Sequence, residues 1–445
     1  MSIILTLFYI RIALFGGMAT WNNWYSDSVS RDGNTIQIFK LDRAKSVSDF
    51  IKIVDDATRN RGYKSLILDF DKVGANYPNA VVPVAGIIKF YREERGIDIE
   101  IINERHIEKT NMLNPKPFDG DSRHILNRVW SFHSSEEVAR IVDAYIEELQ
   151  KSAQFYKGVL NAIEWSLNEV LDNVIQHSKI GFGYVMGQIH QTNKNIAFTV
   201  FDTGQGIYNS MKDSIHHPRT TIDAITMAVK EEVTRDKRIG QGNGLFGLHS
   251  IVKQGKGKLV ITSGSGSYMY NNGDVRTYDS LPFTSRDTPG TIVDFQLNYA
   301  KDMSLDKALV FRGKQYEMIN LHFEDLEDDY GRVLYKISDR SEGTGTRESA
   351  IRVKNEVLNI LSEEQKPITI DFTGVAVISS SFADELIAKL FLSLGLFQFN
   401  NLIKIKGLDA SQQSILQRSV LQRIIEDFRE GDNQEEEGQE NESAS

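Results

Sequence analysis

The chain has 445 residues, of which 40% are hydrophobic and 25% charged, as in ordinary globular domains. This length is enough for about three domains with separate cores. The net charge is −10, but the segment from Glu426 to Ser445 holds nine acidic residues and one arginine, so the rest carries only −2. A nearly neutral body offers no basic surface, and we expect no nucleic-acid partner. The absence of cysteine excludes disulfides, thiolate zinc sites and cysteine nucleophiles, and it is typical of cytoplasmic proteins.

The chain begins with an apolar stretch, which we interpret as a leader spanning residues 1–19, with Met18 as the working start. Its apolar run of about 14 residues is interrupted by Arg11 and is too short to cross a bilayer comfortably. We therefore expect a cytoplasmic protein. Membrane association through residues 3–15 is the alternative.

The first block, residues 20–112, has the pattern of a small α/β module. A buried strand is predicted at 64–70, an amphipathic helix at 79–96 and a second strand at 97–103. Strand, helix and strand in this order form a βαβ unit. The segment 113–135, which contains proline and asparagine, is predicted to be a linker.

The central block, residues 136–300, mixes helices and strands. Serine and glutamate just after His133 indicate a helix start. Strands are predicted at 196–202, 258–263 and 290–297.

The third block, residues 301–428, repeats the plan of the first. A strand at 366–372, a helix at 381–395 and a strand at 401–407 predict a second βαβ unit. Both units contain an aspartate followed by phenylalanine at the end of their first strand. The acidic tail, 429–445, is predicted to be disordered.

One predicted helix of the central block carries an unusual polar stripe. Four polar residues at i, i+3, i+4 and i+7 share one face of it, namely Glu169, Asp172, Asn173 and Gln176. A solvated face usually places lysine or arginine near such acids, and this stripe has none. The stripe therefore indicates a missing cation.

Two glycine-rich stretches follow the stripe. In "DTGQGI", Asp202 ends an apolar strand, and Gly204 and Gly206 permit a close approach of a flat ring. In "GQGNGLFGL", backbone N–H groups ahead of a helix could surround a phosphate. Taken alone, each stretch is equally compatible with a plain turn or a linker.

In order and spacing, these motifs resemble the GHKL ATPases, a family that includes gyrase, large heat-shock chaperones, sensor histidine kinases and anti-sigma-factor serine kinases. "NEVLDNVIQHS" resembles the N box of that family, the two glycine-rich stretches resemble its glycine boxes, and "PGTIVDF" resembles its closing strand. The resemblance covers residues 136–300 and implies an α+β sandwich of the Bergerat type in the centre of an α/β chain. It also implies ATP and Mg²⁺ as cofactors.

The resemblance assigns roles to individual residues. Asn173 would bind Mg²⁺ through its amide oxygen, and Glu169 would be catalytic by activating the group that attacks the γ-phosphate. Asp202 would accept a hydrogen bond from adenine. The remaining ATP-binding residues implied by the family are Gly204, Gly206, Gly242, Gly244, Gly247 and Thr291. Lys237 and Arg238, at the end of a lid-like segment, are further candidates for phosphate contacts.

The third block resembles a STAS-like domain, the fold of anti-sigma-factor antagonists. The resemblance rests on "ITIDFTGVAVISSSFADELIAKLF" and implies Ser380 or Ser381 as a phospho-acceptor. The other interpretation of these serines is structural, because Ser381 to Asp384 has the pattern of a helix capping box. The module at 20–112 is expected to be STAS-like as well.

These observations lead to one principal hypothesis and two alternatives. The first is a slow ATPase that acts as an ATP-dependent regulatory switch, with unidentified protein partners contacting the flanking modules. The second is a serine/threonine kinase of a partner-switching system, and the third is a non-enzymatic sensor of ATP or ADP. A sensor histidine kinase is disfavoured, because the helix before the stripe contains no histidine. By analogy with the GHKL and STAS-like families, we expect a bacterial regulatory protein that could form a homodimer.

Overall fold

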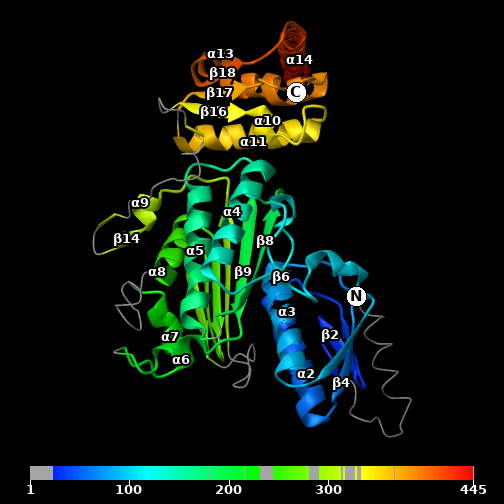
Figure 1. The fold of residues 1–445 in the computed structure, drawn as a ribbon, viewed down its shortest axis with the longest axis vertical. Helices are drawn as coiled ribbons and strands as arrows, with labels where there is room; N and C mark the ends of the chain where they lie inside the picture. The colour runs from blue at the N-terminus through cyan, green and yellow to red at the C-terminus, as the bar shows by residue number, and fades with distance from the viewer. Residues whose placement is uncertain are drawn as a thin grey trace.

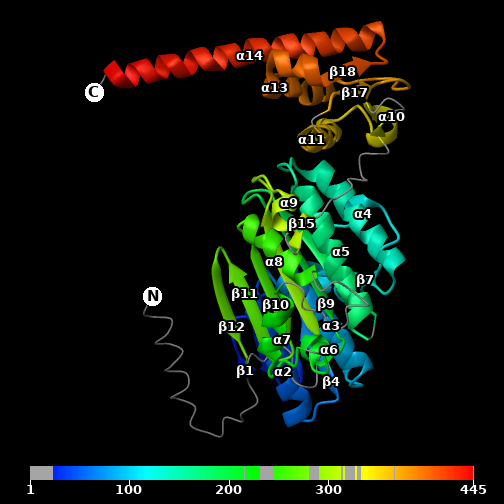
Figure 2. The same cartoon turned by 90° about the vertical axis from the view of Figure 1, so that its left-hand side faces the viewer.

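The computed structural model describes residues 24–179, 181–214, 216–230, 244–279, 290–311, 314–315, 326–327, 332–364 and 366–443. The leader at 1–19 lies outside this range. The described residues form a mixed α/β structure with four sheets, in which the N-terminal and C-terminal blocks lie on different sides of the central one (Figures 1 and 2). No described helix is long and apolar enough to cross a membrane.

The N-terminal block is a five-stranded sheet with helices α2 (Ala44–Asp55) and α3 (Pro78–Glu93). The predicted βαβ unit is confirmed, since β4 and β5 are parallel and α3 connects them. The sheet order is β1 (Trp24–Tyr25), β2 (Val29–Asp32), β3 (Thr35–Ile38), β4 (Ser65–Asp69) and β5 (Asp98–Ile102). A π-helix (Asp56–Asn60) extends α2, and two 3-10 helices (Glu104–His106, Glu108–Thr110) follow β5.

Helix α3 is not amphipathic in the predicted sense, because it is buried nearly all round between two sheets. It packs on its own sheet and also on strands of the central sheet. At Gly86 a Cβ atom would lie 2.4 Å from the ring of Phe201, so this glycine allows the close contact. The N-terminal block and the central sheet therefore share one core, which includes Tyr184 and Ile292.

The central sheet has eight strands in the order β12-β11-β10-β13-β9-β8-β7-β6. Its neighbours are antiparallel except for β6 and β7. The predicted linker at 113–135 supplies β6, β7 and a 3-10 helix (Ser122–His124), because Trp130 and Phe132 bury their side chains in the core. The strands are β6 (Lys116–Pro117), β7 (Trp130–Phe132), β8 (Gly183–His190), β9 (Asn195–Asp202), β10 (Lys258–Ser263), β11 (Gly266–Asn271), β12 (Asp274–Tyr278) and β13 (Thr291–Asn298).

Helices α4 (Ser135–Ser152), α5 (Val159–His177) and α8 (Gly244–Gln254) cover the face of this sheet opposite to α3 (Figure 1). The helix start predicted after His133 is confirmed: the Ser134 hydroxyl accepts the N–H of Glu137, whose carboxylate accepts the N–H of His133. Two short helices, α6 (Gly206–Met211) and α7 (Thr221–Ala228), follow β9.

The C-terminal block has a parallel three-stranded sheet, β16-β17-β18, which confirms the second βαβ unit. Asp69 and Asp371 end equivalent strands and accept equivalent backbone N–H groups two residues later, at 3.0 and 2.9 Å. The elements of this block are β16 (Val333–Lys336), α10 (Ile337–Arg340), α11 (Arg347–Glu364), β17 (Ile368–Asp371), α12 (Ser380–Ala383), a π-helix (Asp384–Ala388), α13 (Lys389–Leu402), β18 (Ile403–Lys406) and α14 (Ala410–Ser443). Before them come α9 (Leu305–Ala308), which packs in the core of the central block, and the strand pair β14 (Val310–Phe311) and β15 (Lys314–Gln315).

Helix α14 includes most of the tail that was predicted to be disordered. Glutamate and glutamine are good helix formers, so a helix that is anchored at its start can continue through this composition. The helix projects away from the other blocks (Figure 2).

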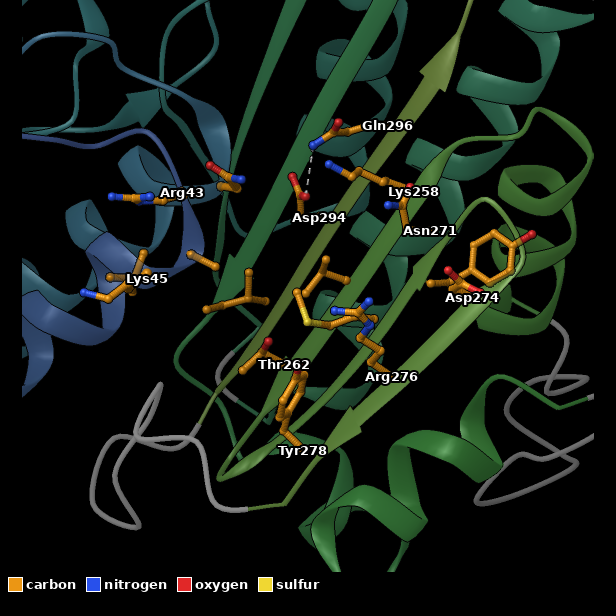
Figure 3. A pocket seen from close by; sticks show the side chains of 17 residues that line it. Arg43, Lys45, Lys258, Thr262, Asn271, Asp274, Arg276, Tyr278, Asp294 and Gln296 are labelled. Atoms are coloured by element: carbon orange, nitrogen blue, oxygen red, sulfur yellow. Dashed lines mark hydrogen bonds between the residues drawn. The ribbon is translucent and has the colours of Figure 1, made fainter. Parts of the chain in front are cut away.

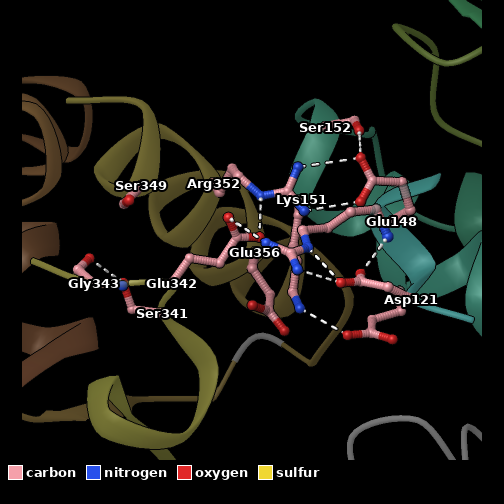
Figure 4. A network of polar contacts seen from close by, with 12 residues as sticks. Asp121, Glu148, Lys151, Ser152, Ser341, Glu342, Gly343, Ser349, Arg352 and Glu356 are labelled. Carbon is pink, nitrogen blue, oxygen red and sulfur yellow. Dashed lines mark hydrogen bonds and ion pairs between the residues drawn. The ribbon is translucent and has the colours of Figure 1, made fainter. Parts of the chain in front are cut away.

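The C-terminal block docks through α11 on the end of α4 (Figure 4). The Arg352 guanidinium makes two hydrogen bonds to the Glu148 carboxylate, at 2.8 and 3.1 Å, and the Ser152 hydroxyl donates to the same carboxylate at 2.8 Å. The carboxylate side chain is nearly buried, at 8% exposed. A paired charge of this kind fixes the orientation of two surfaces, because leaving either partner alone is costly.

Candidate functional site

The polar stripe lies on α5, on the side where α8 begins. Leu167, Val170 and Leu171 are buried in the core, which holds the helix in place. Glu169 and Asn173 are half-buried, and Gln176 is exposed. Glu169 and Asn173 therefore belong to the site, and Gln176 faces solvent.

No lysine or arginine of the described residues pairs with Glu169 or Asp172. Burial raises the pKa of Glu169, and the neighbouring charge of Asp172 raises it further. Burial likewise raises the pKa of Asp172. Within the described part of the chain, no cation favours the ionised form of either carboxylate.

Asn173 contains a buried polar atom without a partner. Its Nδ2 has no hydrogen-bond acceptor among the described residues. A buried amide group without its hydrogen bond costs about 1–3 kcal/mol, so such a group is a candidate ligand contact. The first residue of α8, Gly244, lies beside this pair: a Cβ there would be 2.4 Å from Glu169 Oε2.

Gly247, one turn further along α8, has a packing role. A Cβ atom at this position would lie 2.1 Å from the ring of Trp165 on α5. The glycine therefore brings α8 close to α5 and fixes where the helix begins. Gly242, Lys237 and Arg238 lie outside the described residues.

The "DTGQGI" turn is attached to the C-terminal end of α5. The Gln205 N–H donates to the Ser178 carbonyl at 3.0 Å, and the Gln205 side-chain amide donates to the His177 carbonyl at 2.7 Å. Gly204 has no room for a side chain, because a Cβ would lie 2.3 Å from the Ser178 carbonyl oxygen. Gly206 adopts a φ of 74°, which favours glycine.

Asp202 ends β9 at 5% exposure, and its carboxylate accepts the N–H of Gly204 at 2.7 Å. Burial raises its pKa to about 7, although the N–H groups of Gly204 and Thr291 oppose the shift. Thr291 stands opposite Asp202 in the β9–β13 register. The Asp202 carboxylate can accept a further hydrogen bond.

Ser263 was not singled out from the sequence, yet it holds this corner together. Its hydroxyl accepts the N–H of Ile207 at 2.9 Å, donates to the Gly290 carbonyl at 3.0 Å and lies 3.2 Å from the Thr291 hydroxyl. The available signal was a serine at the end of a strand just before a glycine, in "ITSGSG".

The serines of the C-terminal block lie at the turn after β17. The helix cap is Ser379, which accepts the N–H of Phe382 at 3.0 Å, so the capping assignment to Ser381 is wrong by two residues. Ser381 is half-buried and lies 3.0 Å from the Ser379 hydroxyl, whereas Ser380 is exposed. Of the two predicted acceptors, Ser380 is the accessible one.

Within the described ranges, no group of three histidine, aspartate or glutamate side chains is arranged to hold a metal ion. A metal at the α5 site would therefore need oxygen ligands from a bound molecule in addition to Asn173.

No curated protein matches the chain. Residues 349–413, from α11 to the start of α14, match the family described as STAS-like domain of unknown function (DUF4325). The C-terminal block therefore contains a STAS-like domain, as its sequence predicted.

Proposed function

We propose that the central block binds Mg-ATP in the manner of a GHKL ATPase and acts as an ATP-dependent switch. The observation that carries this proposal is the convergence of two segments on α5. The Gly244 end of α8 lies against Glu169 and Asn173, and the "DTGQGI" turn bonds to the helix end one turn later. Two motifs that are separated along the chain thus contact the helix of the polar stripe, where Asn173 Nδ2 has no hydrogen-bond acceptor among the described residues.

The residues present fit such a cofactor. ATP with Mg²⁺ would supply the electrophilic phosphate and the missing positive charge. The Asn173 amide could offer its oxygen to the metal, which prefers hard oxygen ligands. Glu169 has a pKa raised by burial, as suits a group that takes a proton near neutral pH. Asp202, at the end of β9, would accept a hydrogen bond from the amino group of an adenine.

The switch hypothesis draws support from the docking of α11. The Gly158 N–H, at the start of α5, donates to Glu363 of α11 at 2.7 Å. The helix that carries the site is therefore bonded directly to the STAS-like domain. A change in the position of α5 would alter how this domain sits on the central block.

A serine/threonine kinase is the second candidate, and one observation favours it. The Ser380 hydroxyl is exposed at the first turn of α12, where another molecule can reach it. A protein that only senses ATP or ADP is the third candidate.

The test is incubation of the full chain with Mg²⁺ and γ-labelled ATP, with binding measured in parallel. Free labelled phosphate supports the ATPase, label in protein supports the kinase, and binding without either product supports the sensor. Asn173→Ala should weaken Mg-ATP binding at least about tenfold, and Glu169→Gln should retain binding but lower turnover about 10²-fold or more. Gln176→Ala, an exposed amide on the same face, is the matched control. Absence of binding by the parent protein would refute the proposal.

A further inference from the structure

A cavity lies on the face of the central sheet that points away from α5 (Figure 3). It occupies about 430 Å³, between the start of α2, the start of α3 and strands β10 to β13. This volume is in the range of small-molecule sites. Of the motifs described above, "PGTIVDF" contributes to it through Ile292 and Asp294, and the polar stripe and the two glycine-rich stretches do not.

The sheet presents polar side chains to this cavity. Because side chains alternate along a strand, the residues of β10 and β13 that face away from the helices share this face. They include Lys258, Thr262, Asp294 and Gln296. Where α3 covers the same face, the sheet is apolar instead, with Tyr184 and Phe201. The polar part of this face therefore begins where α3 no longer covers the sheet.

Two side chains that line the cavity, Asp294 and Asn79, can accept further hydrogen bonds. Asp294 is 4% exposed, and its carboxylate accepts the Thr199 hydroxyl at 2.8 Å and, weakly, the Gln296 amide at 3.4 Å. An ionised carboxylate can accept about four hydrogen bonds. Asn79 of α3 also lines the cavity, and its buried Oδ1 has no donor among the described residues. A ligand that carries N–H groups would satisfy both.

Strands β10 and β12 supply positive charge. Lys258 and Arg276 are exposed, and within the described part of the chain neither forms an ion pair. The cations of the opposite wall differ, since Lys45 is bonded to Asp49 at 2.6 Å and to Asp27 at 3.2 Å. Lys258 and Arg276 are therefore the two groups available for an anion.

Apolar side chains line the space between the acceptors and the cations. Ala44 and Val47 come from α2, and Val260, Met269 and Ile292 come from the sheet. Two opposed apolar walls suit the faces of a flat ring, which a sugar phosphate does not have.

We propose that this cavity binds a nucleoside monophosphate. The N–H groups of the base donate to Asp294 and Asn79, the ring lies between α2 and the sheet, and the phosphate meets Lys258 and Arg276. The proposal is independent of the motif site, which lies on the opposite face.

The test is equilibrium dialysis of the full chain against radiolabelled adenosine, guanosine and cytidine monophosphates, with inorganic phosphate and the free nucleosides as comparison ligands. We expect saturable binding of at least one monophosphate. The double variant Lys258→Gln, Arg276→Gln should weaken it about tenfold or more and leave the nucleoside unaffected. Asp294→Asn should weaken the binding of the monophosphate and of the free nucleoside by a similar factor. Lys253→Gln, which removes an exposed cation on the opposite face, should change nothing.

Two further variants complete the test. If thermal denaturation shows that Asp294→Asn does not fold, Asn79→Ala tests instead whether the base donates hydrogen bonds in the cavity. Asn173→Ala separates the two sites, and it should leave monophosphate binding intact. The proposal is overturned if no monophosphate binds saturably, if inorganic phosphate binds as tightly as the nucleotide, or if Asn173→Ala abolishes binding while the cavity variants do not.

Discussion

Asn359, in the middle of α11, fastens the STAS-like domain to the connection between α4 and α5. Its side chain is 1% exposed and makes three hydrogen bonds with the backbone of the central block. The Oδ1 atom accepts the Phe155 N–H at 2.7 Å, and Nδ2 donates to the carbonyls of Gln150 and Ala153, both at 2.9 Å. One amide thus satisfies three backbone groups in a turn that would otherwise be buried without partners.

Replacing Asn359 with alanine should weaken docking of the two blocks by about 3–5 kcal/mol. Each buried group left unpaired costs about 1–3 kcal/mol, and the Phe155 N–H and two carbonyls lose their partner together. The matched control is Asn355→Ala on the same helix. Asn355 makes one hydrogen bond, to the Lys151 carbonyl at 3.1 Å, so its loss should cost about 1 kcal/mol.

The assay combines urea denaturation with amide hydrogen exchange of the full chain. We expect Asn359→Ala to lower the midpoint of the transition that reports on docking and to speed exchange at Phe155. The Asn355 variant should show a small change in the same direction. Equal effects of the two variants, or unchanged exchange at Phe155, would refute the reasoning from the three hydrogen bonds.

Two further predictions concern the candidate site. Gly247→Val places a side chain against the Trp165 ring and should lower the free energy of unfolding by about 2–3 kcal/mol, measured by chemical denaturation. Gly120→Val, at an exposed position with open space around it, is the comparison, and an equal effect would contradict the packing role. Asp202 has a pKa of about 7 in the folded state, against an ordinary value of 3.8. It therefore makes its whole contribution to the free energy of unfolding below pH 4, and loses up to about 4 kcal/mol of it as the pH rises through 7. Asp202→Asn should lack this part of the pH dependence when unfolding free energies at pH 5 and pH 8 are compared with those of the parent, and parallel profiles would argue against the raised pKa.

The sequence predicted local elements well and their surroundings poorly. The Ser134 cap and the two βαβ units depend on residues close together in the chain, and they were found. Helix α3 was expected to have a solvated face, because nothing local indicates that a second sheet covers it. For the same reason the apolar Trp130 and Phe132 were assigned to a linker, although they belong to a strand that needs a partner from β8.

The candidate site likewise contains residues that the sequence indicated and one that it did not. Glu169, Asn173 and Asp202 were chosen because their motifs resemble those of the GHKL family, and the structure brings their segments together. The role of Ser263 depends on Gly290 and Thr291, which are distant in the sequence, so the local signal in "ITSGSG" was not enough to assign it. Whether these residues bind ATP stays a prediction.

The contacts of α11 did leave a signal that was overlooked. The residues that dock on the central block, Arg352, Asn355, Asn359 and Glu363, are spaced by three, four and four positions, so they form one polar stripe on the helix. A helix face that carries amides and charged groups at this spacing indicates a surface that meets a specific partner and not only water. Here the partner is another part of the same chain.

Helix α5 connects this docking surface to the candidate nucleotide site. At its start, the Gly158 N–H is held by Glu363, and Gly158 cannot carry a side chain because a Cβ would lie 2.1 Å from the Met303 carbonyl oxygen. At its end, 19 residues or about 28 Å later, the His177 carbonyl is held by Gln205. A helix fixed at both ends moves as a rigid body, so a ligand that reorders the turn after β9 would shift the contact with Glu363 as well. Under the proposed function, the STAS-like domain would therefore respond to nucleotide through α5 without contacting the nucleotide itself.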